Sequence, residues 1–258
     1  EAADMILTDD NFASIVSAIE EGRTVYNNIR RFIIYILNSN FPEAVPFIIF
    51  LFSRGTIPLA LTVMQVLAID LGTDMIPAIG LGAELPEPGV MDRPPRPQKE
   101  PLLSRGVFSR ALWYGMIESA VAMIAFFFLY ALNGWHPGMP MASTGVVYRT
   151  ATTMTLAGIV CTQIGVVFNC RTERVSVFKA GLTTNRMVLI GVGCELTLLS
   201  LLMYLPFLHG LFNTAPLGLR EWAALLVCAP TMLLIDELRK ALLRTRTQRM
   251  TASMQKSE

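Results

Sequence analysis

The sequence has little charge and almost no histidine for its length. Asp, Glu, Lys and Arg make up 16% of the 258 residues, two residues are histidines, and 53% are apolar, with a mean hydropathy of +0.49. Soluble domains are less apolar, so a membrane protein is the first class to consider. The net charge of +1 carries no functional information, and nothing in the charge pattern supports nucleic-acid binding.

Cysteine pairs and a signal peptide are also missing. The four cysteines lie within or at the ends of apolar segments, and no C-x-x-C spacing occurs, so neither a disulfide framework nor a zinc site is indicated. We expect these cysteines to be packing residues. Residues 1–21 are too acidic and too polar for a cleavable signal peptide.

Long apolar segments are what the sequence has in abundance. Six are long enough to cross a bilayer: 32–52, 58–81, 108–132, 150–169, 186–205 and 221–238. All but three of the 21 lysines and arginines fall before the first segment, after the sixth, or in the connections after the second and fourth, counting the first three residues of the segments that follow these connections. Because cytoplasmic loops are enriched in Lys and Arg, we expect both termini in the cytoplasm.

The N-terminal part predicts a long helix that enters the first apolar segment. Residues 4–8 resemble the end of a buried strand, and Asn11 is a plausible N-cap. From there the apolar periodicity is helical, and the helix can continue through the first span as a rod of ~40 residues, ~60 Å long. Because residues 1–10 supply only part of a strand-containing domain, we expect the chain to be a C-terminal portion. Residues 84–101, with six prolines, predict a stiff cytoplasmic connector.

Acidic residues inside two neighbouring apolar segments are the strongest functional signal. A carboxylate at the centre of a membrane helix costs ~2.5–3.5 kcal/mol, so it needs a function or a partner. Helical spacing places Asn40 within ~60° of Glu43, and Asp70, Thr73 and Asp74 on one face. Pro42, Pro46 and Pro77 remove helical hydrogen-bond donors and free nearby carbonyls. Carboxylates and carbonyls together suit a hard cation, as in the broken helices of transporters.

Other intramembrane polar residues give weaker signals. Gln163 and Glu195 either extend this oxygen cage or make interhelical hydrogen bonds, and Ser39 is a ligand or a packing hydroxyl. Glu118, in the third segment, is more doubtful. Asp236 is expected to form ion pairs with the basic residues that follow it. The competing interpretation of the cage is that each acid is neutral and hydrogen-bonded to a neighbour.

Several motifs resemble the type II P-type cation ATPases along the whole chain. Residues 1–4 and 11–12, 21–23 and 26–28 are similar to the end of that family's phosphorylation domain and its stalk. The runs that resemble its fifth and sixth membrane helices and the following loop are Ser39-Asn40-Phe41-Pro42-Glu43, Asp70-Leu71-Gly72-Thr73-Asp74-Met75-Ile76-Pro77-Ala78 and Met91-Asp92-Arg93-Pro94-Pro95-Arg96.

The resemblance implies an all-α membrane protein with six transmembrane helices, family helices five to ten, a stalk helix and a remnant of the phosphorylation domain. The domains expected are 1–10 (end of the phosphorylation domain), 11–31 (stalk), 32–81 (core ion-binding pair), 82–107 (cytoplasmic Pro-rich loop), 108–243 (four-helix C-terminal transmembrane domain) and 244–258 (basic tail). The metal-binding residues expected are Ser39, Asn40, Glu43, Asp70, Thr73, Asp74, Gln163 and Glu195, and no catalytic or cofactor-binding residue is expected in this chain.

Within the family, Asp70 and Ser39 resemble the sodium/potassium pumps, whereas reticulum-type calcium pumps carry Asn at the position of Asp70. Val166 departs from the sodium pump, which has an Asp there that is linked to its third sodium site. We therefore expect Na⁺ or K⁺ at the membrane site, with Ca²⁺ as the alternative.

The resemblance also implies an ATP-driven pump in the plasma membrane, whose DKTG phosphorylation site, Mg²⁺ and ATP belong to a preceding part of the protein. DKTG is absent from this sequence, so the chain alone should not hydrolyse ATP. Expected partners are membrane lipid, that N-terminal part and an accessory subunit, with no nucleic acid. A free-standing ion-coupled carrier and a membrane-anchoring subunit remain as alternatives.

Overall fold

The computed structural model describes residues 11–87, 89–92, 94–95, 101–173 and 175–255, and these form helices and connections without a strand. The all-α class expected from the sequence is confirmed. The strand expected over residues 4–8 lies outside the described residues. Five helical stretches are long and apolar enough to cross a membrane: Phe12–Phe52, Val63–Gly82, Arg105–Leu132, Gly145–Cys170 and Arg186–Tyr204.

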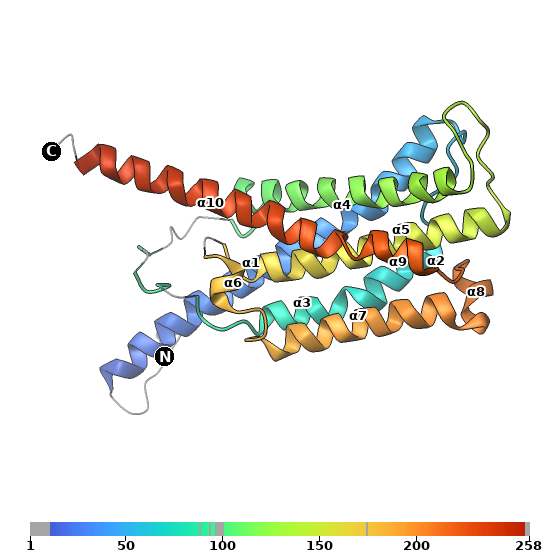
Figure 1. The fold of residues 1–258 in the computed structure, drawn as a ribbon. Helices are drawn as coiled ribbons and strands as arrows, with labels where there is room; N and C mark the ends of the chain where they lie inside the picture. The colour runs from blue at the N-terminus through green and yellow to red at the C-terminus, as the bar shows by residue number, and fades with distance from the viewer. Residues whose placement is uncertain (1–10, 88, 93, 96–100, 174, 256–258) are drawn as a thin grey trace.

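Helix α1 (Phe12–Phe52) is one continuous helix of 41 residues. Asn11 caps its start by accepting a hydrogen bond from the Ala13 amide at 3.0 Å. Pro42 and Pro46 lie inside the helix without ending it. The rod expected from the sequence is therefore confirmed, and in Figure 1 it runs obliquely along the bundle.

The second membrane segment is divided by a wide turn. It consists of α2 (Val63–Ala68), the π-helical turn η1 (Ile69–Thr73) and α3 (Met75–Gly82). Within the expected apolar segment 58–81, the helix begins at Val63, because a capping box formed by Thr62 and Gln65 fixes the N-terminus of α2 there. Pro77 sits in the first turn of α3, where a missing amide costs little.

The remaining long helices pack around a buried centre. Helix α5 (Gly145–Cys170) is the most enclosed, with nearly every residue from Ala151 onward buried. It lies between α4 (Arg105–Leu132) and α10 (Cys228–Gln255) on one side and α3 and α7 (Arg186–Tyr204) on the other (Figure 1). The shorter helices are α6 (Val177–Ala180), α8 (Pro206–Phe212) and α9 (Leu219–Leu225).

The sixth expected span, 221–238, is not one uninterrupted helix. A turn at Leu226 and Val227 separates α9 from α10, and Cys228 begins a new helix that continues to Gln255. Helix α10 also carries the ion pairs expected for Asp236, to Arg239 at 2.6 Å and to Lys240 at 2.9 Å. The interruption and these charges together keep the segment from being an 18-residue apolar helix.

Helices α3 and α7 approach closely because of glycine. A Cβ on Gly191 would lie 2.8 Å from the Pro77 backbone, so only the absence of a side chain permits the contact. This contact brings the helix after η1 against α7.

The two ends of the bundle differ. The start of α1, the end of α3, α6 and the last turns of α10 lie at one end, which we call the stalk end (Figure 1). The connections 53–62, 133–144 and 213–218 lie at the opposite, loop end.

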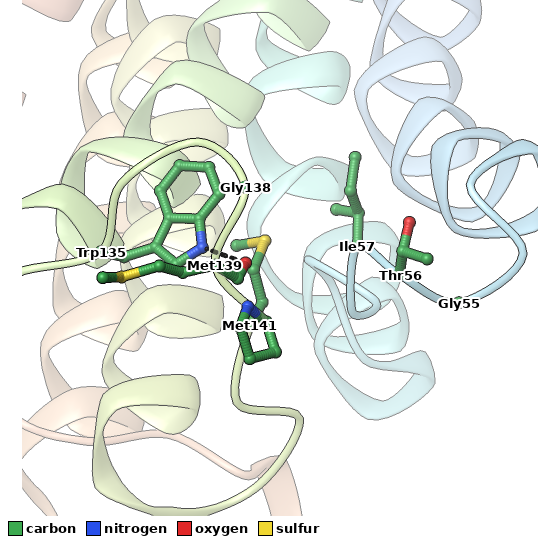
Figure 2. A pocket seen from close by; sticks show the side chains of 8 residues that line it. Gly55, Thr56, Ile57, Trp135, Gly138, Met139 and Met141 are labelled. Atoms are coloured by element: carbon green, nitrogen blue, oxygen red, sulfur yellow. Dashed lines mark hydrogen bonds between the residues drawn. The ribbon is translucent and has the colours of Figure 1, made fainter.

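The loop end contains a pocket of about 610 Å³ between the first two of these connections. Trp135 closes one side of it by donating from Nε1 to the Met139 carbonyl at 2.9 Å (Figure 2). Its lining residues are Gly55, Thr56, Ile57, Trp135, Gly138, Met139, Pro140 and Met141. None of them is charged, so this pocket offers no carboxylate to a cation.

Candidate ion-binding site

Three carboxylates from the first two membrane segments converge. One oxygen from each of Glu43, Asp70 and Asp74 lies within 4.8 Å of the other two. Glu43 is 6% exposed and Asp74 1%, while Asp70 is half-buried. We call this group the carboxylate cluster. The sequence predicted this convergence from helical spacing within each segment, together with the expectation that the two segments face each other.

The π turn positions two of these carboxylates. The amide of Asp74 donates to the Ile69 carbonyl five residues earlier, at 3.0 Å, where an α-helix would use a carbonyl four residues earlier. One extra residue is thereby accommodated between Asp70 and Asp74, next to Gly72. Such turns occur mostly as single insertions and often at functional sites.

The cluster belongs to a polar layer that crosses the whole bundle. An apolar core at the stalk end includes Ile34, Ala78 and Val188, and a second core at the loop end includes Phe126, Ala157 and Leu199. The buried polar residues between them are Asn38, Ser39 and Glu43 of α1, Thr73 and Asp74 at η1, Glu118 and Ser119 of α4, Thr162 and Gln163 of α5, and Glu195 of α7. Five membrane helices thus contribute to one layer.

The other expected ligands occupy different positions in this layer. Gln163 donates from Nε2 to Asp74 Oδ2 at 3.3 Å, so it lies directly against the cluster. Ser39 and Thr73 are buried and donate to carbonyls of their own helices, Ile36 at 3.0 Å and Ile69 at 3.1 Å. Glu195 is 0% exposed and accepts from the Tyr35 hydroxyl at 3.2 Å.

Asn40 is the expected ligand that the structure does not bring to the cluster. Its side chain is exposed and donates to the Ile36 carbonyl at 2.6 Å. In this conformation the side-chain amide of Asn40 is hydrogen-bonded within α1. Its role as a ligand stays a prediction.

Many oxygen atoms in the layer have no hydrogen-bond partner. Among the described residues, the buried and unpartnered oxygens of the layer are Asn38 Oδ1, Glu43 Oε1, Asp74 Oδ1, Glu118 Oε1, Gln163 Oε1 and Glu195 Oε2. Buried polar atoms are nearly always satisfied in folded proteins. Six unsatisfied acceptors in one layer therefore indicate partners that the chain itself does not supply: cations, protons or water.

Basic side chains do not neutralise the carboxylates of the polar layer. In the described part of the chain, the ion pairs lie at the stalk end, and none includes a carboxylate of the polar layer. An oxygen-only donor set with several carboxylates fits a hard metal cation, whose ligands are carboxylates, carbonyls and water.

The structure also contains polar layer members that the sequence interpretation missed. Tyr35 and Asn38 lie on α1, three residues apart and therefore on one face, and they bond Glu195 and Glu118, respectively. The signal for Asn38 was available, because an amide next to Ser39 in an apolar segment needs a buried partner. The signal for Tyr35 was weak, because a tyrosine at helical spacing usually indicates packing.

At the stalk end, hydrogen bonds join α1 to the segment after α3. Asn28 donates from Nδ2 to the carbonyls of Gly82 and Glu84 at 3.2 and 2.7 Å. The Glu84 carboxylate in turn accepts from Arg171 at 2.8 and 2.9 Å, and Arg171 is 2% exposed. The end of α3 is therefore connected both to the stalk and to the connection after α5.

Comparison with known proteins agrees with this architecture. A family model described as "Cation transporting ATPase, C-terminus" matches residues 58–242. The chain is 36% identical to sodium/potassium-transporting ATPase subunit alpha-2 of Bos taurus and 38% identical to that of Gallus gallus. It is 35% identical to subunit alpha-4 of Rattus norvegicus. Each match covers 95% of this chain and 26% of the relative, so the chain spans about a quarter of the length of these proteins.

Proposed function

The chain belongs to the family of cation-transporting ATPase C-terminal regions, and from this premise we propose that it forms the ion-binding membrane part of an ATP-driven pump of the sodium/potassium type. The observation that carries the proposal is the carboxylate cluster, with three carboxylates within 4.8 Å and no basic partner among the described residues. A bound cation supplies the positive charge that this group lacks.

We further propose that the ligands are Glu43, Asp70 and Asp74, supported by Ser39, Thr73, Gln163 and Glu195, with Asn40 able to join only after leaving its bond to Ile36. Na⁺ and K⁺ are the proposed cargo, since the relatives are named for these ions. Ca²⁺ is the alternative cargo, because three carboxylates also suit a divalent ion.

In this proposal, ATP hydrolysis, Mg²⁺ binding and aspartate phosphorylation take place in a part of the protein that precedes this chain. Residues 1–10 would be the end of the phosphorylation domain, 11–31 the stalk, 32–81 the ion-binding pair, 82–107 the cytoplasmic loop, 108–243 the C-terminal transmembrane domain and 244–258 the tail. Both termini would be cytoplasmic and the protein would lie in the plasma membrane, where an accessory subunit is a possible partner.

The mechanism derived from the chain is mechanical and electrostatic. Helix α1 is continuous from the stalk end to Glu43, so a displacement of the stalk moves one cluster carboxylate directly. The same displacement acts on Asp70 and Asp74 through Asn28 and the segment after α3. Because η1 is a wide turn with poorer helical bonding, it is the place where the second segment can yield. Changing the separation of the three carboxylates would alternate binding and release of the cation.

The test is phosphorylation of the full-length protein by ATP, titrated separately with Na⁺, K⁺ and Ca²⁺. We expect one of these ions to stimulate phosphorylation in the wild type, and the double variant Asp70→Asn, Asp74→Asn to lose the stimulation. Glu173→Gln, which removes a half-buried carboxylate 3.7 Å from Arg30 at the stalk end, is the charge-matched control. Undiminished stimulation in the double variant would contradict the proposal.

A further inference from the structure

Glu118 is a buried carboxyl in the polar layer that the carboxylate cluster does not include. It lies on α4 and is 0% exposed. Its Oε2 accepts from Asn38 Nδ2 at 2.9 Å, and its Oε1 has no partner. The Oδ1 atom of Asn38, which is also 0% exposed, is likewise unpartnered. Glu118 is thus hydrogen-bonded to Asn38, which is not one of the proposed ligands.

A close helix contact places this carboxyl against α1. A Cβ on Gly115 would lie 2.4 Å from the Phe41 ring, so the glycine lets α4 approach α1 at this level. Glu118 follows Gly115 by three residues and therefore lies on the same face of α4. Glu118 consequently faces the protein interior and Asn38, away from lipid.

The titratable groups whose charges act on Glu118 come from α1, the end of η1, α5 and α7. They are Tyr35 and Glu43 of α1, Asp74 after η1, Cys170 of α5 and Glu195 of α7. None of them is basic. An ionised carboxylate without a cation in such a position is costly, and the group becomes neutral instead.

A proton fits this position better than a second metal ion. The Glu118–Asn38 pair offers two unpartnered oxygens, Glu118 Oε1 and Asn38 Oδ1. A hard cation such as Ca²⁺ takes six to eight oxygen ligands, whereas a proton needs one. Among the described residues, Glu118 also belongs to no group of three acids within metal-binding distance.

We propose that Glu118 is a proton-binding residue of the transport cycle, so that the protein exchanges a proton for the cation that enters the carboxylate cluster. With the cluster empty, Glu118 carries a proton on a carboxyl oxygen. When a cation binds beside Asp74, its positive charge compensates the negative groups of the layer and favours the ionised form of Glu118. The O–H bond then breaks, the electron pair stays on the carboxylate, and the proton passes to water.

This inference rests on the proposed function and deepens it by adding a second transported or exchanged ion. Linkage makes the effect reciprocal: if cation binding releases a proton from Glu118, acid must weaken cation binding. One exchanged proton changes the cation affinity by up to tenfold per pH unit. The cluster carboxylates also bind protons in acid, so the contribution of Glu118 is the difference between the wild type and a variant at this position.

The experiment measures the half-saturating concentration of the activating cation for phosphorylation of the full-length protein between pH 6 and 8. It is paired with proton release, recorded with a pH indicator in weak buffer when that cation is added. The variants are Glu118→Gln, which mimics the protonated form, and Ser119→Ala as a control from the same buried turn. Ser119 donates to the Gly115 carbonyl within α4.

We expect Glu118→Gln to reduce the slope of the logarithm of the half-saturating cation concentration against pH by up to about one unit. We also expect it to reduce proton release by up to about one proton per site. Ser119→Ala should change neither quantity. Equal slopes and equal proton release in the wild type and Glu118→Gln would overturn the inference.

If Glu118→Gln does not fold, Asn38→Ala serves instead. Loss of its amide donor disfavours ionised Glu118 and shifts the pH curve toward alkaline values, and an unshifted curve would overturn the inference. Absence of stimulation by Na⁺, K⁺ and Ca²⁺ in the wild type would instead refute the proposed function.

Discussion

Asn28 of α1 donates its side-chain amide to the backbone carbonyl of Glu84 at 2.7 Å, which bonds the stalk to the segment that follows α3. The same amide reaches the Gly82 carbonyl at 3.2 Å. Arg31 donates to Asn28 Oδ1 at 2.6 Å and holds the amide in this orientation. The stalk and the second ion-binding segment are therefore connected outside the polar layer.

The first prediction concerns this connection. Asn28→Leu removes both hydrogen bonds, and we expect cation-stimulated ATP hydrolysis of the full-length protein to fall about fivefold or more, equivalent to ~1 kcal/mol. Cation occlusion should keep its half-saturating concentration, because the polar layer is untouched. Thr24→Val is the control, since Thr24 bonds only the Glu20 carbonyl of its own helix in the contacts described. A parallel loss of occlusion and hydrolysis would show that Asn28 does not act as a link.

The second prediction concerns the buried ion pair between Arg171 and Glu84. Arg171→Met leaves the Glu84 carboxylate without its cation, and we expect a loss of ~3–5 kcal/mol in stability, measured as a lower thermal unfolding temperature in detergent. The double variant Arg171→Met, Glu84→Gln should recover part of this loss, because no charge is then left unpaired. Arg171→Lys should remain destabilised, since one ammonium cannot replace the two-pronged contact. A double variant as unstable as the single one would contradict this reasoning.

The third prediction separates two adjacent residues of the expected ligand set, Ser39 and Asn40. Ser39 is buried in the polar layer, whereas Asn40 is exposed and bonded to Ile36. We expect Ser39→Ala to raise the half-saturating cation concentration and Asn40→Ala to change it by less than about threefold, which is under ~1 kcal/mol. A larger effect for Asn40→Ala would mean that its amide turns into the cluster when the cation binds.

The fourth prediction concerns Gln163, which donates to Asp74 Oδ2 at 3.3 Å. Gln163→Leu removes this donor and an unpartnered oxygen together. We expect weaker cation affinity than in the wild type, by about tenfold or less, but a smaller effect than that of Asp74→Asn, because an amide contributes less than a carboxylate to cation binding. An effect larger than that of Asp74→Asn would place the centre of the site elsewhere.

The sequence was sufficient for the features that depend on local periodicity. Helical spacing predicted the continuous α1 and placed Asp70 and Asp74 on one face, since residues three or four apart share a helix face. Their convergence with Glu43 followed from the added expectation that the two segments face each other. The basic residues near Asp236 predicted its ion pairs for the same reason.

Features that depend on contacts between distant segments were out of reach. The π turn at Ile69–Thr73 changes the hydrogen-bond register by one residue, which leaves no mark in the apolar pattern. The outward orientation of Asn40 depends on competition between a ligand and the Ile36 carbonyl. The pairing of Glu118 with Asn38 depends on the close approach of Gly115 to Phe41, which a single sequence does not reveal.

The central claim is that the carboxylate cluster binds the transported cation. It is tested most directly by equilibrium occlusion of ²²Na⁺, ⁸⁶Rb⁺ or ⁴⁵Ca²⁺ by the full-length protein, comparing Asp74→Asn with Glu173→Gln. Each change removes one negative charge, but only Asp74 belongs to the cluster. We predict that Asp74→Asn raises the half-saturating concentration about tenfold or more, from the ~1.5–3 kcal/mol of one charged contact, while Glu173→Gln matches the wild type. Equal occlusion by the wild type and Asp74→Asn would contradict the account.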